Sequence, residues 1–371
     1  MALIGIKNIS NRARQIHEAS LCIDIHNHIM FEYAIHEALG KKNVFDTYYA
    51  PMLKAGGINV IATSVGGNSP CVCNLTDDLI HGSLEQIDML RRAEEQGAGF
   101  SICTTVKALR QTVAQGKIAV LLAFEGARVL EGLDNEESLV LLRTFYRLGL
   151  RTICIVGGAR TRFADGMGDA RAQAGLTTFG CKLIQEMNRL GILIDLTHMT
   201  DRSFFDSIET TSKPIVVSHI GVQAVCNNPN NLSDERIRAI GRNGGVIGME
   251  MVKTEIEWEY EKSKNPITWK NVIKHIRHIG DLIGLEHIGL GLDFDHFDLV
   301  DNIHRAMCPT PGSIEGFYTG IPKSDHMLDE PKNLKETPLI TEYLLRDGFT
   351  ESEISQILGG NMLQLLQETI G

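Results

Sequence analysis

The chain of 371 residues carries a formal net charge of −10, with 22% charged and 43% hydrophobic residues, as in ordinary globular proteins. Its acidic balance, without a local Lys/Arg cluster, excludes nucleic acid as an expected partner. Eight cysteines without a CxxC pair favour a reducing compartment over a disulfide framework. No apolar run approaches the length of a membrane span, so we expect a cytoplasmic protein without membrane contact.

Apolar runs typical of buried strands alternate with amphipathic helical patterns along most of the chain. The strand-like runs cover residues 21–29, 58–65, 118–125, 151–156, 192–198, 214–219, 245–251 and 287–295. Helical patterns lie between them, at 84–96, 137–148, 183–190, 234–242 and 267–283. This alternation in one chain of this length predicts an α/β fold, the (β/α)8 TIM barrel of metal-dependent hydrolases.

No linker rich in Pro, Gly or Ser divides the chain, so we expect a single barrel domain over residues 1–371. A helical lead over residues 1–20 precedes the barrel, and closing helices over about 334–371 follow it. Two segments exceed ordinary loop length, at 68–82 and 295–333. Because loops after parallel strands leave from the C-terminal face, both are expected to wall an active site.

Several of the apolar runs end in a histidine or a carboxylate. A strand alternates its side chains, so two histidines one residue apart lie on the same side of the first strand. The carboxyl ends of barrel strands meet at one rim, where barrel active sites form. The residues predicted to converge there are His26, His28, Glu125, His198, His219 and Asp293.

Each of these residues taken alone has a structural explanation. A strand-end histidine is more often a hydrogen-bonding residue than a ligand, and Glu125 before Gly126 could cap a helix. Asp24 and Asp195 precede the rim and are expected to do structural work. Four histidines and two carboxylates at one rim are much harder to explain in this way.

The set predicts a site for two divalent metal ions, zinc or a similar ion, because its ligands are nitrogen and oxygen without thiolate. One ion would bind His26 and His28, and the other His198 and His219. Glu125 would bridge the two ions. A metal-activated water would attack a carbonyl, with Asp293 as general acid/base.

Longer motifs extend over nearly the whole chain. They are RQIHE at 14–18, GLTTFG at 175–180, MNRLGILIDLTH at 187–198, SH at 218–219, HIGLGLDFD at 287–295 and ILGGN at 357–361. In these motifs the chain resembles the renal (membrane) dipeptidase family of zinc metallopeptidases, family M19 of the amidohydrolase-like barrels. The resemblance implies a binuclear zinc barrel, usually a homodimer, that hydrolyses dipeptides. It also implies that Glu125 is the bridging ligand, His198 and His219 are second-site ligands, and Asp293 is the general acid/base.

Three positions depart from the pattern of that family. His28 stands where the family has an aspartate, so the first metal should be held more weakly. Gly157 replaces a substrate-contacting histidine, and Asn230 replaces a substrate-binding arginine. Arg160 or Arg162 could replace the lost anchor as a carboxylate clamp, unless both are surface arginines of the loop.

The sequence therefore predicts a metal-dependent hydrolase that cleaves the amide bond of a dipeptide or a small peptide-like substrate. The departures at Gly157 and Asn230 favour an alternative substrate on the same site: a lactone, a cyclic amide or a modified amino acid. A third hypothesis is a catalytically inactive barrel that serves as a binding or assembly subunit. The retained rim residues argue against it, and uptake of a divalent ion by the purified protein would test it.

Overall fold

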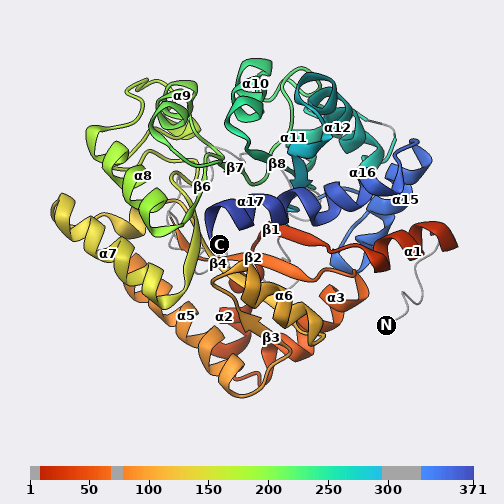
Figure 1. The fold of residues 1–371 in the computed structure, drawn as a ribbon, viewed down its shortest axis with the longest axis horizontal. Helices are drawn as coiled ribbons and strands as arrows, with labels where there is room; N and C mark the ends of the chain where they lie inside the picture. Colours follow the sequence, from red (N-terminus) through yellow and green to blue (C-terminus); the bar gives the residue numbers. More distant parts are fainter. Residues whose placement is uncertain (1–8, 68–77, 264, 295–326) are drawn as a thin grey trace.

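The computed structural model describes residues 9–67, 78–263, 265–294 and 327–371 (Figure 1). Eight parallel strands close into a ring, because β1 pairs with both β2 and β9, and β2 also pairs with β4. The strands of the ring are β1 (Ile23–Asn27), β2 (Val60–Gly67), β4 (Ile118–Glu125), β5 (Leu150–Cys154), β6 (Leu193–Asp195), β7 (Val216–Val217), β8 (Val246–Met249) and β9 (Ile288–Leu290). The predicted (β/α)8 barrel is confirmed.

One further strand was not predicted. β3 (Phe100–Ile102) pairs with the first residues of β4, where Phe100 lies opposite Ile118, and it is not part of the closed ring. It is only three residues long, so its apolar pattern is too short to be distinguished from a loop.

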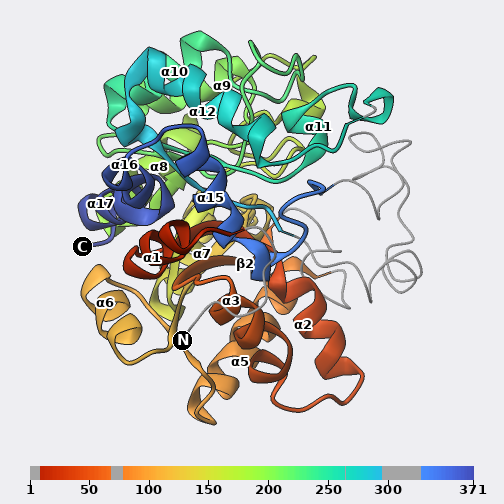
Figure 2. The same ribbon diagram turned by 90° about the vertical axis from the view of Figure 1, so that its right-hand side faces the viewer.

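The helices surround the ring of strands (Figures 1 and 2). The predicted helical patterns correspond to α5 (Leu79–Glu95), α7 (Asn135–Leu148), α8 (Thr178–Leu190), α10 (Asp234–Asn243) and α12 (Trp269–Ile283). The others are α1 (Asn11–Ala19), α2 (Ile29–Ala38), α3 (Ala50–Ala55), α6 (Val106–Ala114), α9 (Asp201–Thr210), α11 (Lys253–Ile256), α15 (Pro338–Arg346), α16 (Glu351–Ser355) and α17 (Asn361–Thr369). Short π-helical turns cover Phe45–Tyr49 and Gln356–Gly360, and 3-10 turns cover Arg128–Leu130, Met167–Asp169, Tyr260–Lys262, Leu285–His287 and Leu334–Glu336.

Local sequence explains where several of these helices begin and end. The side chains of Asp134, Thr177 and Ser233 cap α7, α8 and α10 by accepting a hydrogen bond from a backbone N–H of the first turn. α7 and α8 stop at Gly149 and Gly191, whose positive φ angles satisfy the left-handed conformation of a helix C-cap. The chain therefore turns back toward the barrel after each of them.

The central strands are buried on both faces, as expected for a parallel barrel strand. In β4, Val120, Leu122 and Phe124 belong to the larger hydrophobic cluster, and the alternating alanines and Leu121 belong to a second cluster. That second cluster also contains Met362, Leu365 and Leu366 of α17 together with the first residues of β6, β7 and β8.

α17 therefore covers the N-terminal ends of these strands. Figure 2 shows it on the opposite side of the molecule from α2 and α11, which follow strands at the other end. The carboxyl ends of the strands remain for the functional site. No helix in the described part of the chain is long and apolar enough to cross a membrane. Of the two long predicted loops, residues 68–77 and 295–326 lie outside the described residues, so their role as walls stays a prediction.

Candidate metal centre

The carboxyl ends of five strands bring the six predicted rim residues together. His26 lies in β1, Glu125 ends β4, and the other four residues follow β1, β6, β7 and β9 directly or within three positions. Their potential ligand atoms form two groups, each with its atoms within 4.8 Å of one another. The first group is His26, His28 and Asp293, and the second is Glu125, His198 and His219.

The first group has the spacing of atoms that share one ion. His26 Nε2 lies 3.2 Å from His28 Nε2, and Asp293 Oδ1 lies 2.9 Å from His28 Nε2 and 3.5 Å from His26 Nε2. Two donors on one tetrahedral zinc ion, each about 2.0 Å from it, lie roughly 3.3 Å apart. The Asp293 carboxylate is thus close enough to act as a ligand as well as in proton transfer.

The second group is joined to the first by Glu125. His198 Nε2 lies 3.0 Å from His219 Nε2 and 3.6 Å from Glu125 Oε1. The other oxygen of the same carboxylate, Oε2, lies 3.7 Å from His28 Nε2. One oxygen of Glu125 therefore faces each group, which is the arrangement that a bridging carboxylate requires.

The protonation states favour a cation at this centre. Burial, with His28 and His198 nearby, lowers the pKa of His26 to about 3, and burial lowers that of His219 well below its usual value. Burial alone would raise the pKa of Glu125, but the surrounding imidazoles outweigh it and hold that pKa below its ordinary value. Neutral imidazoles beside an ionised carboxylate are the forms that bind a divalent metal.

For His198 the balance is different. Burial opposes its charged form, but the adjacent Glu125 carboxylate outweighs this effect and raises the pKa of His198. This imidazole therefore takes up a proton more readily than His26 or His219 when no cation is bound. A divalent ion would have to compete with that proton, which makes ion binding at the second group sensitive to pH.

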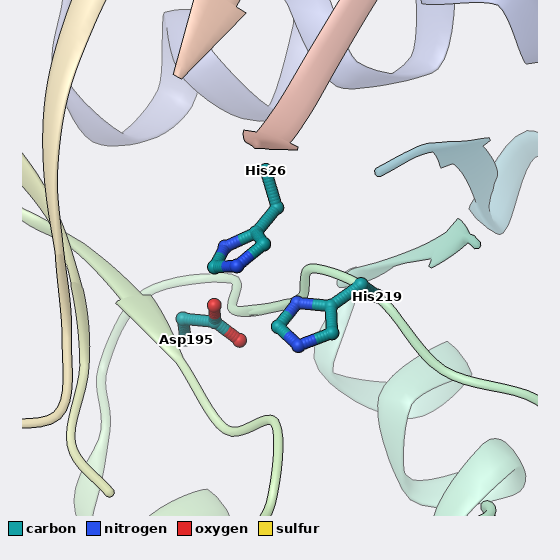
Figure 3. A group of neighbouring side chains, drawn as sticks. All are labelled: His26, Asp195 and His219. Carbon is teal, nitrogen blue, oxygen red and sulfur yellow. The ribbon is translucent and has the colours of Figure 1, made fainter. Parts of the chain in front are cut away.

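Hydrogen bonds outside the two groups fix the orientation of His219. Ser218 Oγ lies 2.8 Å from His219 Nδ1 and donates a hydrogen bond to Asp195 Oδ2. When Nδ1–H donates to this hydroxyl, the lone pair of Nε2 is left for a metal. Figure 3 shows Asp195 beside His219 and His26, whose rings stack with centroids 3.9 Å apart.

Asp195 itself is also close enough to His26 and His219 to count as a potential ligand. Its oxygens, however, already accept hydrogen bonds from the backbone N–H and hydroxyl groups of both Thr197 and Ser218. We therefore infer that it orients the site, in line with the structural role expected from the sequence. Asp24 behaves in the same way, because Leu292 N donates to its Oδ1 at 2.8 Å and ties β1 to the residue before Asp293.

Backbone geometry also distinguishes two of the rim residues. His198 has a φ of 63° and Asp293 a φ of 48°, in the left-handed region that residues other than glycine rarely adopt. Such conformations persist where the surrounding structure imposes them, and they cluster at functional sites.

Two glycines allow the backbone beside His219 to pack closely against its neighbours. A Cβ atom on Gly248 of β8 would lie 1.8 Å from the Ser218 carbonyl oxygen, and a Cβ on Gly291 would lie at the same distance from it. Both positions therefore exclude every side chain. The Ser218 carbonyl fits between β8 and the end of β9 because neither strand carries a side chain there.

Asn230 lies against the opposite side of His198. His198 Nδ1 is 3.2 Å from Asn230 Nδ2 and 3.5 Å from Asn230 Oδ1, and Asn230 Nδ2 also donates a hydrogen bond to Glu255 Oε1 at 3.2 Å. The amide nitrogen is the nearer atom, so a metal at Nε2 requires the His198 tautomer in which Nδ1–H faces the amide oxygen. The predicted role of Asn230 as a substrate contact stays a prediction.

The other predicted substrate contacts lie in the loop after β5. Gly157 offers no side-chain donor there. Arg160 has a side chain 47% exposed, and its Nε lies 3.0 Å from Oδ1 of the buried Asp165. Arg162 donates to the Gly132 carbonyl oxygen. A carboxylate clamp by Arg160 stays a prediction, and it would compete with the pair that this residue makes with Asp165.

Two buried carboxyl groups near the centre were missed by the sequence analysis. Glu250 directly follows β8 and is 1% exposed, and Glu255 lies in α11 and is 5% exposed. Glu250 carries the signal that led to Glu125, a carboxylate at the end of an apolar run. Glu255 carries no such signal, because its position depends on how α11 folds over the rim.

Comparison with known proteins identifies the family of the chain. The family described as membrane dipeptidase (peptidase family M19) matches residues 10–304. Dipeptidase 3 of Rattus norvegicus is 28% identical over 302 residues, which cover 80% of this chain and 54% of that protein. Dipeptidase tcpJ of Claviceps purpurea is 26% identical over 301 residues, covering 80% of this chain and 62% of that protein. The chain thus spans about half to three-fifths of the length of these curated relatives.

Solved structures share the fold over nearly the whole chain. A structure described as dipeptidase AC, a metallopeptidase of family M19, superimposes with a TM-score of 0.77 at 22% identity, covering 95% of this chain and 99% of that one. A metallopeptidase from Rhodobacter sphaeroides, bound to a phosphinate mimic of the dipeptide L-Ala-D-Ala, gives 0.75 at 21% identity, covering 94% and 99%. With its family match over most of its length, the chain belongs to the membrane dipeptidase family, peptidase family M19.

Proposed function

We propose that this protein is a binuclear metal-dependent hydrolase that cleaves the amide bond of a dipeptide or a small peptide-like substrate. The observation that carries the proposal is the Glu125 carboxylate, with one oxygen toward His28 and the other toward His198. A carboxylate between two donor groups favours a pair of ions over a single one. Membership of a metallopeptidase family supports amide hydrolysis as the reaction.

The donor set suits zinc. Each of the two groups offers imidazole nitrogens and carboxylate oxygens and contains no thiolate. When bound, such ions polarise a carbonyl oxygen and lower the pKa of a water molecule. His26 and His28 would hold one ion, and His198 and His219 would hold the other, with Glu125 shared between them. Asp293, beside the first pair, would serve in proton transfer and is not needed as a ligand.

The protein's own residues would handle the protons. Asp293 follows β9 at the rim, with Oδ1 2.9 Å from His28 Nε2, and this closeness to a candidate ligand supports a role for its carboxylate in deprotonating the attacking water. It would accept that proton and return it to the leaving amine. Asp195 and Ser218 would keep His219 in the tautomer that leaves Nε2 unprotonated.

The same site could serve an amide or ester that is not a dipeptide. Gly157 offers no side chain and Asn230 no charge, where the family resemblance implies a histidine and an arginine that contact substrate. A lactone, a cyclic amide or a modified amino acid is therefore the second candidate class of substrate. Rapid turnover of such compounds, with slow turnover of every dipeptide, would favour this candidate.

Two further expectations accompany the proposal. The resemblance implies a homodimer, which analytical ultracentrifugation would test. Among the described residues, Cys22, Cys103, Cys154, Cys181 and Cys226 are free thiols, and the reducing compartment expected from the sequence stays a prediction. Fractionation of cells would test a cytoplasmic location.

The deciding experiment is hydrolysis of a panel of L- and D-dipeptides by the zinc-loaded protein, with Asp293→Asn as control. We expect the variant to retain bound metal, measured by mass spectrometry, while kcat falls by about 10²- to 10⁴-fold. Undiminished turnover in Asp293→Asn would exclude the proposed proton transfer. Failure of the wild-type protein to take up any divalent ion would exclude the hydrolase and favour a binding or assembly subunit.

A further inference from the structure

Glu250 and Glu255, here called the acidic pair, lie beside the metal centre. Glu255 Oε1 accepts a hydrogen bond from Asn230 Nδ2 at 3.2 Å, and Asn230 in turn contacts His198. Both carboxyl groups interact electrostatically with Asp293. The acidic pair therefore faces the side of the centre on which His198 and Asp293 lie.

In the described part of the chain, no lysine or arginine forms an ion pair with the acidic pair, and the only charged imidazole that acts on Glu255 there is that of His198. Glu250 is 1% exposed, and among the described residues its Oε1 has no hydrogen-bond partner. Lys253, which lies between the two glutamates in sequence, directs its ammonium group to Asp329 at 2.9 Å. A buried carboxylate without a partner is costly, so this atom is suited to a positive group that arrives with a ligand.

The two carboxyl groups also repel each other. Burial, followed by Glu255 and Asp293, raises the pKa of Glu250 well above its usual value, and burial raises that of Glu255 to about 7. A cation held between them would offset both the burial and the repulsion. An anion brought to the same place would increase both costs.

The acidic pair lies beside a position that bears on substrate binding. Asn230 stands at the position where the family resemblance implies an arginine that binds the substrate. In this chain the position is neutral, and its neighbour is the Glu255 carboxyl group. A position at which the resemblance implies a positive side chain thus holds a neutral one beside a buried carboxyl group.

We propose that the acidic pair is a cation-binding subsite, which binds an ammonium or guanidinium group on the leaving-amine side of the scissile bond. This inference rests on the proposed function for the identity of that bond. It narrows the substrate to an amide whose leaving amine carries a positive group where a dipeptide carries its terminal carboxylate. Selectivity would come from repulsion of the anion as well as from attraction of the cation.

Three probes with the same alanyl half and different charges on the leaving amine test the proposal. They are alanyl-glycine, which is anionic there, alanyl-glycinamide, which is neutral, and alanyl-(2-aminoethyl)amide, which is cationic. With the zinc-loaded full chain, we expect kcat/KM to be at least about tenfold higher for the cationic than for the neutral probe, and lowest for the anionic one. Equal values, or the highest value for alanyl-glycine, would overturn the proposal.

Variants then test whether Glu250 and Glu255 cause the preference for the cationic probe. Glu250→Gln and Glu255→Gln keep the size of the side chain and remove its charge, so each should lower the ratio of cationic to neutral probe by about tenfold. Glu259→Gln is the matched control, because this glutamate is exposed nearby and pairs with Lys262. It should leave the ratio unchanged. An unchanged ratio in both variants of the acidic pair would overturn the proposal. It would show that the two glutamates have only a structural role and do not contact the probe.

Binding separates this inference from the proposed function. Calorimetry with zinc-loaded Asp293→Asn measures probe affinity without turnover, and the cationic probe should bind more tightly than the neutral one. If it does so and Glu255→Gln removes the difference, the subsite stands even when the wild-type protein hydrolyses none of the probes. In that case the proposed hydrolase fails instead. Equal affinities in this background would overturn the subsite.

Discussion

His28 Nε2 lies 2.9 Å from Asp293 Oδ1. His28, which by the resemblance stands where the family has an aspartate, is thus in direct contact with the carboxylate proposed as general acid/base. Its imidazole also lies 3.2 Å from His26 Nε2, so it takes part in the first donor group despite its different length and charge. Among the described residues, the group of His26, His28 and Asp293 therefore contains a single carboxylate, that of Asp293.

Returning an aspartate to this position should strengthen metal binding. In His28→Asp an anionic oxygen replaces a neutral nitrogen, so we expect zinc affinity at the weaker of the two sites to rise by about tenfold or more. His28→Ala should lower it. Competition with a chromophoric chelator measures both, and His81→Asp on exposed α5 is the control for an added charge elsewhere. A weaker site in His28→Asp would contradict the assignment of His28 as a ligand.

The hydroxyl of Ser218 should matter for metal affinity rather than for folding alone. Ser218→Ala removes the link between Asp195 and His219 Nδ1, so we expect zinc affinity to fall by about 10- to 100-fold. Thr197→Val is the control, because the Thr197 hydroxyl bonds Asp195 and the backbone of Ser218, and its removal keeps the Ser218 hydroxyl that contacts His219. Equal losses of affinity in the two variants, measured by chelator competition, would argue against this role of Ser218.

A positive charge at position 230 should change substrate selectivity. In Asn230→Arg the guanidinium would lie beside Glu255, so we expect kcat/KM for alanyl-glycine to rise about tenfold relative to the cationic probe. Asn230→Gln, which adds length without charge, is the control and should leave the ratio near the wild-type value. If both variants change the ratio equally, side-chain size and not charge governs this position.

Acid should destabilise the metal-free protein through buried histidines far from the centre. Burial lowers the pKa of His17 to about 4, although its ring lies 2.8 Å from the Gly56 carbonyl oxygen and 2.7 Å from the Thr341 hydroxyl. The unfolded chain takes up this proton near pH 6.5 and the folded protein only near pH 4. The free energy of unfolding should therefore decrease as the pH falls from 6.5 to 4, by about 3 kcal/mol from this residue.

His17→Gln removes the titrating ring and keeps one amide that can donate to Gly56. Urea unfolding at pH 7 and pH 4.5 should show a smaller loss of stability in this variant than in the wild-type protein. His81→Gln, on the exposed surface of α5, should lose as much stability as the wild type. An equally steep loss in His17→Gln would show that other groups account for the acid sensitivity.

The barrel was predictable because its strands are buried on both faces. Each predicted run overlaps one strand of the ring, even where the strand is as short as Val216–Val217. The short β3 was not predicted, because three residues are too few to show a period. The strand also does not end in a histidine or a carboxylate. The segments with the weakest local pattern are thus the ones that sequence reasoning missed.

The same distinction applies to the site. The six rim residues follow from strand ends alone, since parallel strands deliver their carboxyl ends to one place. The contact of Asn230 with His198 and Glu255 does not follow from the sequence, because it depends on how the loop after β7 packs against α11. Glu250 could have been found by the rule that identified Glu125, a carboxylate at the end of an apolar run. It was missed because apolar residues on both sides place it inside the predicted run 245–251.

The closeness of the Ser218 carbonyl to Gly248 and Gly291 has an evolutionary consequence. Any replacement of either glycine would push the strand that positions His219 out of place, so mutation cannot adjust this wall of the barrel gradually. New selectivity must instead arise in segments that leave the strands, such as α11 and the loop that contains Asn230. Packing therefore constrains the wall that carries His219 more tightly than it constrains these outer segments.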